Sequence, residues 1–514
     1  MKKILTIATA FMLAVSLTGC QKWLEATSSS QISGEKLFTS RAGFHEALSG
    51  VYLLMGSSSC YGMNYTWFVN ELTAAPLAKQ NGNIYNDLQN NRYTTVHTTP
   101  YIESMWSGGY NVIANVNKIL LELENRRDVV SDQTEYSLIK GELLAIRAYL
   151  HFDLMCMFGL PSWGGENASK LTIPYVTVYE KEPAVQRSYS ETAALLMADI
   201  DEAIELLSSD PIRGNVSQEF DESINADGFW DRRTFHLNWY AVRALKARVL
   251  LQQEEYAAAA QLSKEILDEV LEKEVVRWVD PVELINTIDS DYESRDWTFS
   301  CEHLFTLEIP DYFDSLKAYF FGADNAHGNF LVLSQAVVSE LYQIPYIFTD
   351  DGWVTPVGDI RGPALMLTYS AQGYRIYKYY SSGSSVYRNR QPMIRISELC
   401  FICAEAAIRD NDLESATSYI NMVNAHRGIE EKLRPDNNVD LTGNNPLYFL
   451  WKEYIKEFIC EGRVFNFRKR VDEDIFTGGV GGGEGTDELL YRSFNVLTYP
   501  YPVEETSYGH IQEL

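Results

Sequence analysis

The sequence predicts a mostly α-helical protein, and three observations support this fold class. Apolar residues recur every three or four positions in several long segments, which is the spacing of one face of an α-helix. Two segments, beginning at Ala247 and at Ala404, share one helix–turn–helix pattern. Apolar residues make up 46% of the 514 residues and aromatic residues 13%, so the chain can build a large core.

The first part of the chain reads as an export signal. A short basic start precedes the apolar run Ile4–Leu17, which is shorter than the roughly 20 residues that span a bilayer. The run leads into Leu-Thr-Gly-Cys, a pattern that suits a lipoprotein signal peptidase. We predict a signal peptide at residues 1–19 and a lipid anchor on Cys20. An ordinary secretory signal with a chance cysteine is the alternative.

The first strong helix signal follows further along the chain. Six apolar residues between Ile139 and Met157 are spaced 4, 3, 4, 4 and 3. Gly159 and Pro161 predict its end. A second helix is expected soon afterwards, because Ser188 or Ser190 precedes an acidic first turn in the pattern of a capping box.

The two similar segments read ARVLLQQEEYAAAAQLSKEIL and AEAAIRDNDLESATSYINMVN. Each predicts a helix, a short polar turn and a second helix, with small residues where the helices approach closely. This is the pattern of a tetratricopeptide (TPR) helix pair. Three long insertions interrupt the array, at about residues 56–100, 161–187 and 275–392.

Charge and cysteine usage exclude some functions. The formal net charge is −27, so nucleic acid is not an expected partner. Cys400 and Cys403 have the spacing of a redox or zinc motif. They also lie on one helical face with Ile396 and Ala407, and no second such motif exists. We therefore predict that both thiols are buried and inert.

No catalytic motif stands out. The chain lacks a phosphate-binding loop, HExxH and GxSxG, and its eight histidines are scattered. Glu453, Glu457 and Glu461 are spaced four apart and so share one helical face. Arg463, Arg468 and Arg470 follow closely in sequence. These arginines predict a structural ion network, although counts of acidic residues leave a glycosidase pair open.

Seven segments, in order along the chain, resemble the SusD/RagB family of outer-membrane nutrient-binding lipoproteins. The matching segments are the start CQKWLEATSSSQISGEKLF, WSGGYNVIANVNKIL, GELLAIRAYLHFDLMCMFGLP, DIR, IRISELCFICAEA, the run from Glu457 to Arg468, and the tail YPYPVEE. One departure is Asn466, which stands where the family usually has aspartate.

The resemblance implies a single SusD-like α-helical domain over residues 20–514, with loops and short strands elaborating one face. It implies about four TPR-like helix pairs, at about residues 139–207, 239–269, 394–427 and 447–471. It also implies a place on the outer membrane facing the cell exterior, anchored through Cys20. The expected partner is a SusC-like TonB-dependent transporter, over which the lipoprotein sits as a ligand-capturing lid, and no catalysis is expected.

The resemblance further implies that the ligand, an oligosaccharide, binds on the first insertion and the early part of the third. Sugars stack apolar faces on aromatic rings and direct hydroxyls to amides and guanidinium groups. The candidate ligand-binding residues are Asn81, Asn83, Tyr85, Arg92, Tyr93, Tyr312, Tyr319, Phe320 and Asn329. Local packing is the alternative role for each aromatic ring. A peptide or glycopeptide ligand stays open, as does a lipid-anchored glycoside hydrolase. No cofactor or catalytic residue is expected, and a structural calcium ion in the acidic loops stays open.

Overall fold

The computed structural model describes most of the chain after the predicted signal peptide. The described residues are 36–78, 82–214, 222–286, 295–321, 331–342, 348–349, 352–353, 358–363, 365–370, 373–381, 385–429, 433, 446–476, 497–507 and 511–512. The predicted signal peptide and Cys20 lie outside them.

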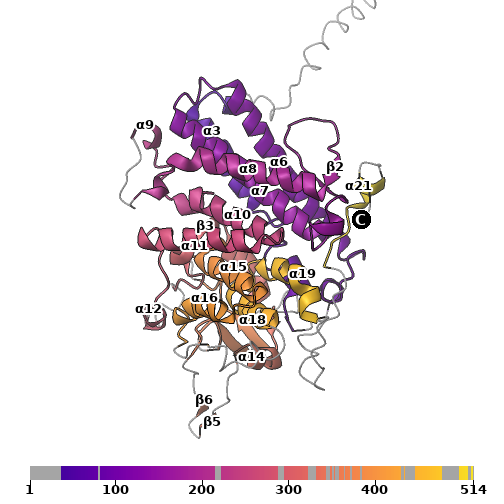
Figure 1. The fold of residues 1–514 in the computed structure, drawn as a ribbon, viewed down its shortest axis with the longest axis vertical. Coiled ribbons are helices and arrows are strands. Elements are labelled where there is room, and N and C mark those ends of the chain that lie inside the picture. The colour runs from indigo at the N-terminus through magenta and orange to yellow at the C-terminus, as the bar shows by residue number, and fades with distance from the viewer. Residues whose placement is uncertain are drawn as a thin grey trace, which may run out of the picture.

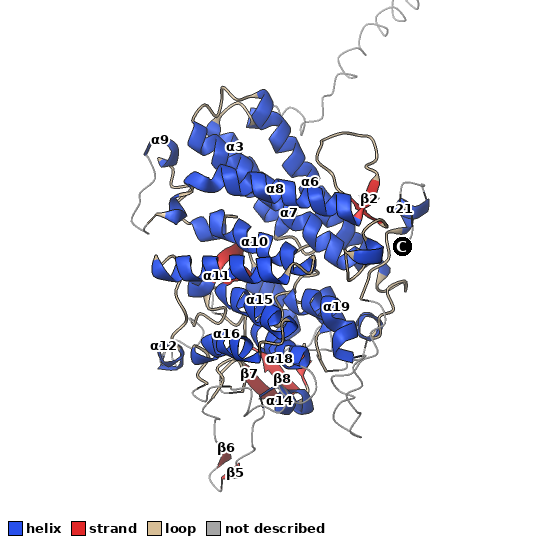
Figure 2. Ribbon diagram, in the orientation of Figure 1, coloured by secondary structure: helices blue, strands red, loops and turns tan. Residues whose placement is uncertain are grey.

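Helices dominate the architecture, which confirms the predicted fold class (Figure 2). The helices before the third insertion are α3 (Arg41–Met55), α4 (Val69–Ala74), α5 (Asn83–Gln89), α6 (Thr99–Asn125), α7 (Gln133–Phe158), α8 (Tyr189–Leu206), α9 (Glu222–Asn225), α10 (Trp239–Gln252) and α11 (Tyr256–Glu272). The later helices are α12 (Pro281–Asn286), α13 (Tyr312–Phe320), α14 (Gln335–Tyr342), α15 (Ile396–Arg409), α16 (Leu413–Ala425), α18 (Pro446–Phe458), α19 (Arg463–Phe476) and α21 (Val503–Ser507).

Four helix pairs form the frame of the molecule. They are α7 with α8, α10 with α11, α15 with α16, and α18 with α19. Each pair packs on the next, through α8 on α10, α11 on α15, and α15 on α18. Figure 1 shows α7 and α8 in the upper half, α10 and α11 below them, and the last two pairs side by side in the lower half. The similar segments that begin at Ala247 and Ala404 therefore lie in neighbouring pairs of one stack.

Helix α7 runs through the centre of the upper half. Its start is fixed because the Asp132 side chain accepts a hydrogen bond from the backbone N–H of Glu135. The helix ends at Gly159, as predicted. Nearly every residue from Glu135 to Phe158 is buried, so its neighbours cover the helix on all sides.

The third insertion carries most of the strands. Strand β3 (His303–Glu308) pairs antiparallel with β9 (Arg390–Arg395), and these two strands bracket most of the insertion. A second sheet has the order β4 (Val332–Leu333), β8 (Gly373–Ile376), β7 (Leu367–Ser370). The remaining strands are β1 (Leu171–Pro174) with β2 (Gln186–Ser188), and β5 (Phe348–Thr349) with β6 (Gly352–Trp353).

The described cysteines are unpaired, and all but the half-buried Cys301 are buried. Cys400 and Cys403 lie within α15, and burial raises the pKa of the Cys403 thiol to about 12. A thiol with so high a pKa stays protonated near neutral pH and is a poor nucleophile. The prediction that both thiols are buried is confirmed. Among the described helices, none is both long enough and apolar enough to cross a membrane.

Candidate ligand-binding site

Three tyrosines from distant parts of the chain meet around one phenylalanine. Tyr85 lies on α5, Tyr101 in the first turn of α6, and Tyr319 in the last turn of α13. Their ring centroids lie 5.8, 5.5 and 5.6 Å from that of Phe68, in that order. We call these four residues the tyrosine cluster. It joins the first insertion to the early part of the third.

Local sequence positions the tyrosines. Helix α5 begins after Gly82, whose φ of 144° favours glycine. Tyr85 shares the inward face of α5 with Leu88, three positions later. On α13, Leu316 and Phe320 are buried, whereas Tyr319 lies at the edge of this buried face and is half-buried.

The buried ring of Trp67 packs against two residues of the tyrosine cluster, Phe68 and Tyr319. Trp67 is 1% exposed, and its ring centroid lies 4.9 Å from that of Tyr319. Its indole N–H donates to the carbonyl oxygen of Gly62 at 2.9 Å. A packed ring with a satisfied N–H has little freedom to move. Trp67 therefore helps to hold Tyr319 in place.

Tyr85 and Tyr319 are uncharged near neutral pH, because the pKa of each is raised. Burial raises the pKa of Tyr85 to about 12, and the neighbouring Tyr319 and Tyr101 hydroxyls contribute to the rise. Burial likewise raises the pKa of Tyr319. Protonated phenols both donate and accept hydrogen bonds. The cluster thus offers apolar rings and neutral hydroxyls to a ligand, a combination that suits a polar, uncharged molecule with apolar faces.

Two predicted polar residues lie on the same part of the first insertion. Asn83 is exposed in the first turn of α5. The Arg92 side chain is 52% exposed, and its guanidinium lies 2.7 Å from the carboxylate of the largely buried Asp87. Asp87 also accepts a hydrogen bond from the hydroxyl of Thr95 at 2.7 Å. Arg92 is therefore held near α5 while part of its guanidinium faces solvent.

Three other predicted aromatic residues belong to the core. Tyr312 is 1% exposed, and its hydroxyl donates to the side chain of Gln391. Phe320 is equally buried against Trp67. Tyr93 is 7% exposed and packs edge-on against Tyr499. Packing therefore accounts for these rings, as it does in part for Tyr85, which is 6% exposed, and contact of any of them with a ligand stays a prediction.

The remaining predicted residues, Asn81 and Asn329, lie outside the described part of the chain. Sequence reasoning missed Tyr101, because the first insertion was bounded at Pro100. The signal that could have found it is its place one residue after Pro100, a proline typical of a helix start.

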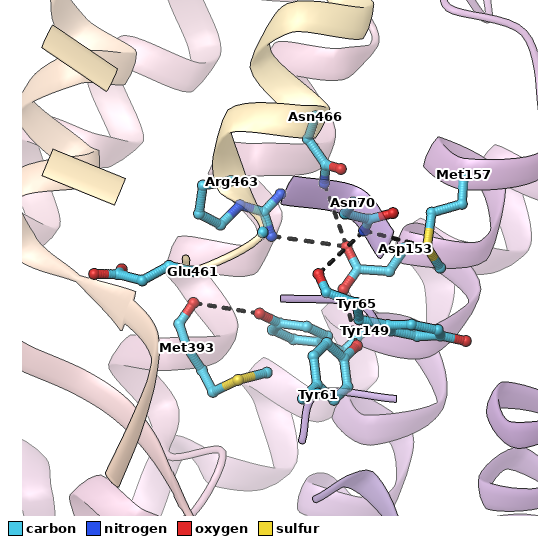
Figure 3. Close-up of a pocket in the computed structure, with 11 residues that line it drawn as sticks. Tyr61, Tyr65, Asn70, Tyr149, Asp153, Met157, Met393, Glu461, Arg463 and Asn466 are labelled. Atoms are coloured by element: carbon cyan, nitrogen blue, oxygen red, sulfur yellow. Dashed lines mark hydrogen bonds and ion pairs between the residues drawn. The ribbon is translucent and has the colours of Figure 1, made fainter. Parts of the chain in front are cut away.

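A separate polar cavity lies beneath this surface, where the segment Tyr61–Asn70 meets α7 and the start of α19 (Figure 3). It has space for about one water molecule and cannot hold a sugar ring. Tyr61 donates to Asp153 at 2.8 Å within it. The cavity therefore belongs to the interior of the protein and not to the candidate ligand surface.

The acidic helix face predicted to form an ion network does so. Glu457 is fully buried, and its carboxylate lies 2.6 Å from the guanidinium groups of both Arg395 and Arg427. Burial alone would raise the pKa of Glu457, but Arg427 and Arg395 hold it well below its usual range. A carboxylate held ionised in this way cannot act as a general acid near neutral pH.

The partners in this network come from elsewhere in the chain than the sequence suggested. Arg395, Arg427 and Arg361 approach Glu457 from β9, from the residues after α16 and from the third insertion. The neighbouring arginines point to other groups: Arg468 donates to the carbonyl oxygen of Ala74, and Arg470 pairs with Glu405. Within the described residues, no group of three or more His, Cys, Asp or Glu side chains is placed to hold a metal ion.

Comparison with known proteins identifies the family to which this chain belongs. Residues 22–223 match the sequence profile of a family described as "Starch-binding associating with outer membrane". Residues 362–470 match the profile of the SusD family. The two matches together span more than half of the chain. No curated protein matches the sequence significantly.

Solved structures share the fold. A SusD superfamily protein from Bacteroides thetaiotaomicron superposes with a TM-score of 0.67 at 19% identity, covering 92% of this chain and 99% of that one. A SusD superfamily protein from Bacteroides vulgatus gives 0.64 at 16% identity, covering 92% and 98%. A SusD-like carbohydrate binding protein from Bacteroides vulgatus gives 0.59 at 17% identity, covering 84% and 83%. The chain belongs to the SusD/RagB family.

Proposed function

We propose that this protein is a non-catalytic, cell-surface lipoprotein that captures oligosaccharide and passes it to a TonB-dependent, SusC-like transporter in the outer membrane. The observation that carries the proposal is the tyrosine cluster. Tyr85 and Tyr319, two predicted ligand-binding residues, come from segments more than 200 residues apart, and both contact Phe68. Apolar rings beside neutral hydroxyls match the apolar faces and hydroxyls of a sugar.

The ionised state of the Glu457 carboxylate favours ligand binding over hydrolysis as the function. A glycosidase needs two carboxyl groups whose environments separate their pKa values, one kept protonated as the acid. Glu457 is instead held ionised by Arg427 and Arg395. Incubating the purified protein with candidate polysaccharides tests this, because new reducing ends would contradict the binding-only role.

Calorimetry with a panel of oligosaccharides tests the ligand site. Tyr85→Ala and Tyr319→Ala are each expected to weaken binding by roughly 3- to 10-fold, since an aromatic contact contributes about 0.5–1.5 kcal/mol beyond its buried area. Tyr179→Ala is the control, because Tyr179 is 52% exposed on the loop between β1 and β2, outside the cluster. The site assignment fails if both cluster variants bind the ligand as tightly as the unchanged protein.

The same titrations decide between ligand classes. Peptides and glycopeptides are the second candidate ligands for a SusD-like protein of this kind. Binding of unglycosylated peptides, lost in Tyr85→Ala and Tyr319→Ala, would move the proposal to peptide capture at the same surface. Binding of neutral oligosaccharides, lost in the same variants, is the expected result.

The lipid anchor and the transporter are tested in cells. A cysteine directly after an apolar export signal supports acylation of Cys20, and acylation on one residue by several chains holds a protein at a membrane. Cys20→Ala is expected to release the protein from the membrane fraction. Protease treatment of intact cells should cut the unchanged protein, and its purification should bring down the outer-membrane transporter.

A further inference from the structure

Arg463, the first residue of α19, is a buried cation that lies near two carboxylates without a hydrogen bond to either. The residue is 8% exposed. Its guanidinium lies 3.7 Å from the carboxylate of Asp153 on α7 and 3.9 Å from that of Glu398 on α15. Both distances exceed the length of a hydrogen bond. Among the described residues, no hydrogen bond from the Arg463 guanidinium is found, although that group carries five N–H donors.

The neighbouring charged groups already have hydrogen-bond partners. Glu398 receives two hydrogen bonds from Arg248, at 2.6 and 2.5 Å. Asp153 accepts from Tyr61 at 2.8 Å and from the Asn466 amide at 3.4 Å. A buried donor without an acceptor is costly, so such groups are almost always satisfied by protein or by ordered water.

Two small cavities adjoin Arg463 and supply the space. The first lies towards Asp153, and in Figure 3 the side chains of Arg463, Asn466 and Tyr61 point to that carboxylate. The second lies towards Glu398 and Arg248. Arg463 and Asn466 line both cavities. Each has room for about one water molecule, and each has the two to four polar partners that a buried water needs.

The chemistry of the lining excludes other occupants. A metal cation would lie against the Arg463 guanidinium, which repels it. An anion would lie against the carboxylates of Asp153 and Glu398. Water donates to the carboxylates and accepts from the guanidinium, so it alone satisfies both kinds of neighbour.

We propose that two buried water molecules bridge Arg463, one to Asp153 and the other to Glu398. The bridged arginine is then the junction of α7, α15 and α19, which belong to three of the four helix pairs. The junction also positions the segment Tyr61–Asn70, because Tyr61 is bonded to Asp153. That segment carries Trp67 and Phe68, whose rings contact the tyrosines of the cluster.

The close approach of Gly462 supports the same arrangement. Gly462 has a φ of 76°, and a side chain there would place its Cβ 2.1 Å from the carbonyl oxygen of Tyr65. The backbone before Arg463 is therefore pressed against the segment Tyr61–Asn70. This backbone contact holds the start of α19 beside the segment that the proposed water link also reaches.

A crystal structure of the mature chain, at a resolution that defines ordered solvent, tests the proposal directly. The expected result is one water within hydrogen-bond distance of the Arg463 guanidinium and Asp153, and a second linking Arg463 to Glu398. Direct hydrogen bonds from Arg463 to both carboxylates, with no solvent density between them, would overturn it. So would density for a metal ion or an anion in either cavity.

Amide hydrogen exchange of Arg463→Met tests the positioning role. Methionine keeps an apolar stem of similar length and removes the donors. Exchange of the amides of Tyr65, Phe68 and Asn70 is expected to become at least about tenfold faster, because a charge-assisted link to their segment is lost. Arg243→Met is the matched control, since Arg243 on α10 bonds directly to Glu265 and Glu269. Unchanged exchange in a folded Arg463→Met protein would refute the positioning role without touching the ligand assignment.

Discussion

Glu457 shows how much of the stability of this protein depends on single buried charges. Its carboxylate lies between Arg395 and Arg427 and also accepts from Arg361 at 3.1 Å. Arg427 continues the network to Glu302 at 2.7 Å. All of these groups are buried, so the removal of one leaves the others without compensation in a medium of low dielectric constant.

Glu457→Gln is therefore expected to lower the free energy of unfolding by about 3–5 kcal/mol, as breaking a buried ion pair usually does. Chemical denaturation of the two proteins measures the difference. Glu265→Gln is the control, because the Glu265 side chain is 51% exposed beside Arg243 and its loss should cost less than about 1 kcal/mol. Similar losses in both variants would mean that burial does not set the strength of these pairs.

Glu142 gives the protein a predictable response to acid. Burial alone would raise its pKa, but His236 and Arg233 lower it to about 2, from an ordinary value of 4.5. A depressed pKa means that the ionised group stabilises the folded state above the ordinary value, and that this stability is lost as the pH falls. The window of loss runs from about pH 4.5 down to about pH 2, and the loss amounts to about 3 kcal/mol.

Denaturation measured across this range tests the assignment. The unchanged protein should lose stability steadily between about pH 4.5 and pH 2. Glu142→Gln should be less stable at neutral pH and should have a shallower slope across the window, because it has no carboxylate to protonate there. An unaltered slope in the variant would assign the acid response to other carboxylates.

At the scale of whole elements, helix ends are encoded locally. Ser188 and Ser190 both precede Glu191, the acidic residue in the first turn of α8, and the sequence left open which of them is the cap. The structure selects Ser188, whose side chain accepts from the backbone N–H of Glu191 while the Glu191 side chain accepts from the backbone N–H of Ser188. Only the residue directly before the helix can complete both bonds of a capping box.

Ser188→Ala is expected to destabilise the protein by about 1 kcal/mol, within a range of about 0.5–2 kcal/mol for the loss of a helix cap. Ser190→Ala, two positions further on, should change stability by less than about 0.5 kcal/mol, as an ordinary surface substitution does. Thermal denaturation of the pair provides the comparison. The capping assignment is wrong if the two variants are equally destabilised.

At the scale of the whole molecule, a segment near the C-terminus joins parts of the chain that are distant in sequence. The backbone N–H of Tyr499 donates to the carbonyl oxygen of Met157 at 3.0 Å, at the end of α7. Its hydroxyl donates to Asn70 at 2.9 Å. Its ring stacks on Phe465 of α19, with the centroids 5.4 Å apart. One residue thus connects α4 with α7 and α19, which belong to the first and last helix pairs.

Tyr499→Ala should therefore reduce the free energy of unfolding by about 3–5 kcal/mol, the usual cost of removing a large buried ring. Tyr499→Phe keeps the ring and removes the hydrogen bond, so it should cost only about 0.5–1.5 kcal/mol. Urea denaturation distinguishes the two effects. Equal losses in both variants would assign the role to the hydroxyl and not to the packed ring.

The sequence by itself determined the features that local physics encodes. The apolar spacing from Ile139 to Met157 predicted α7, and Gly159 ended it where expected, because helix periodicity and helix termination depend on nearby residues. The burial of Cys400 and Cys403 followed in the same way from their place on one helical face. The resemblance in seven ordered motifs pointed to the family that the comparisons then established.

Only the tertiary structure decided which residues meet. Tyr85, Tyr101 and Tyr319 converge on Phe68, whereas Tyr93 packs against Tyr499 and Tyr312 bonds to Gln391, and no local pattern separates these outcomes. Glu457 likewise has partners from distant segments and not the arginines nearest to it in sequence. Both outcomes have one physical reason: burial and pairing depend on how the helix pairs stack, and these contacts join residues far apart in the chain.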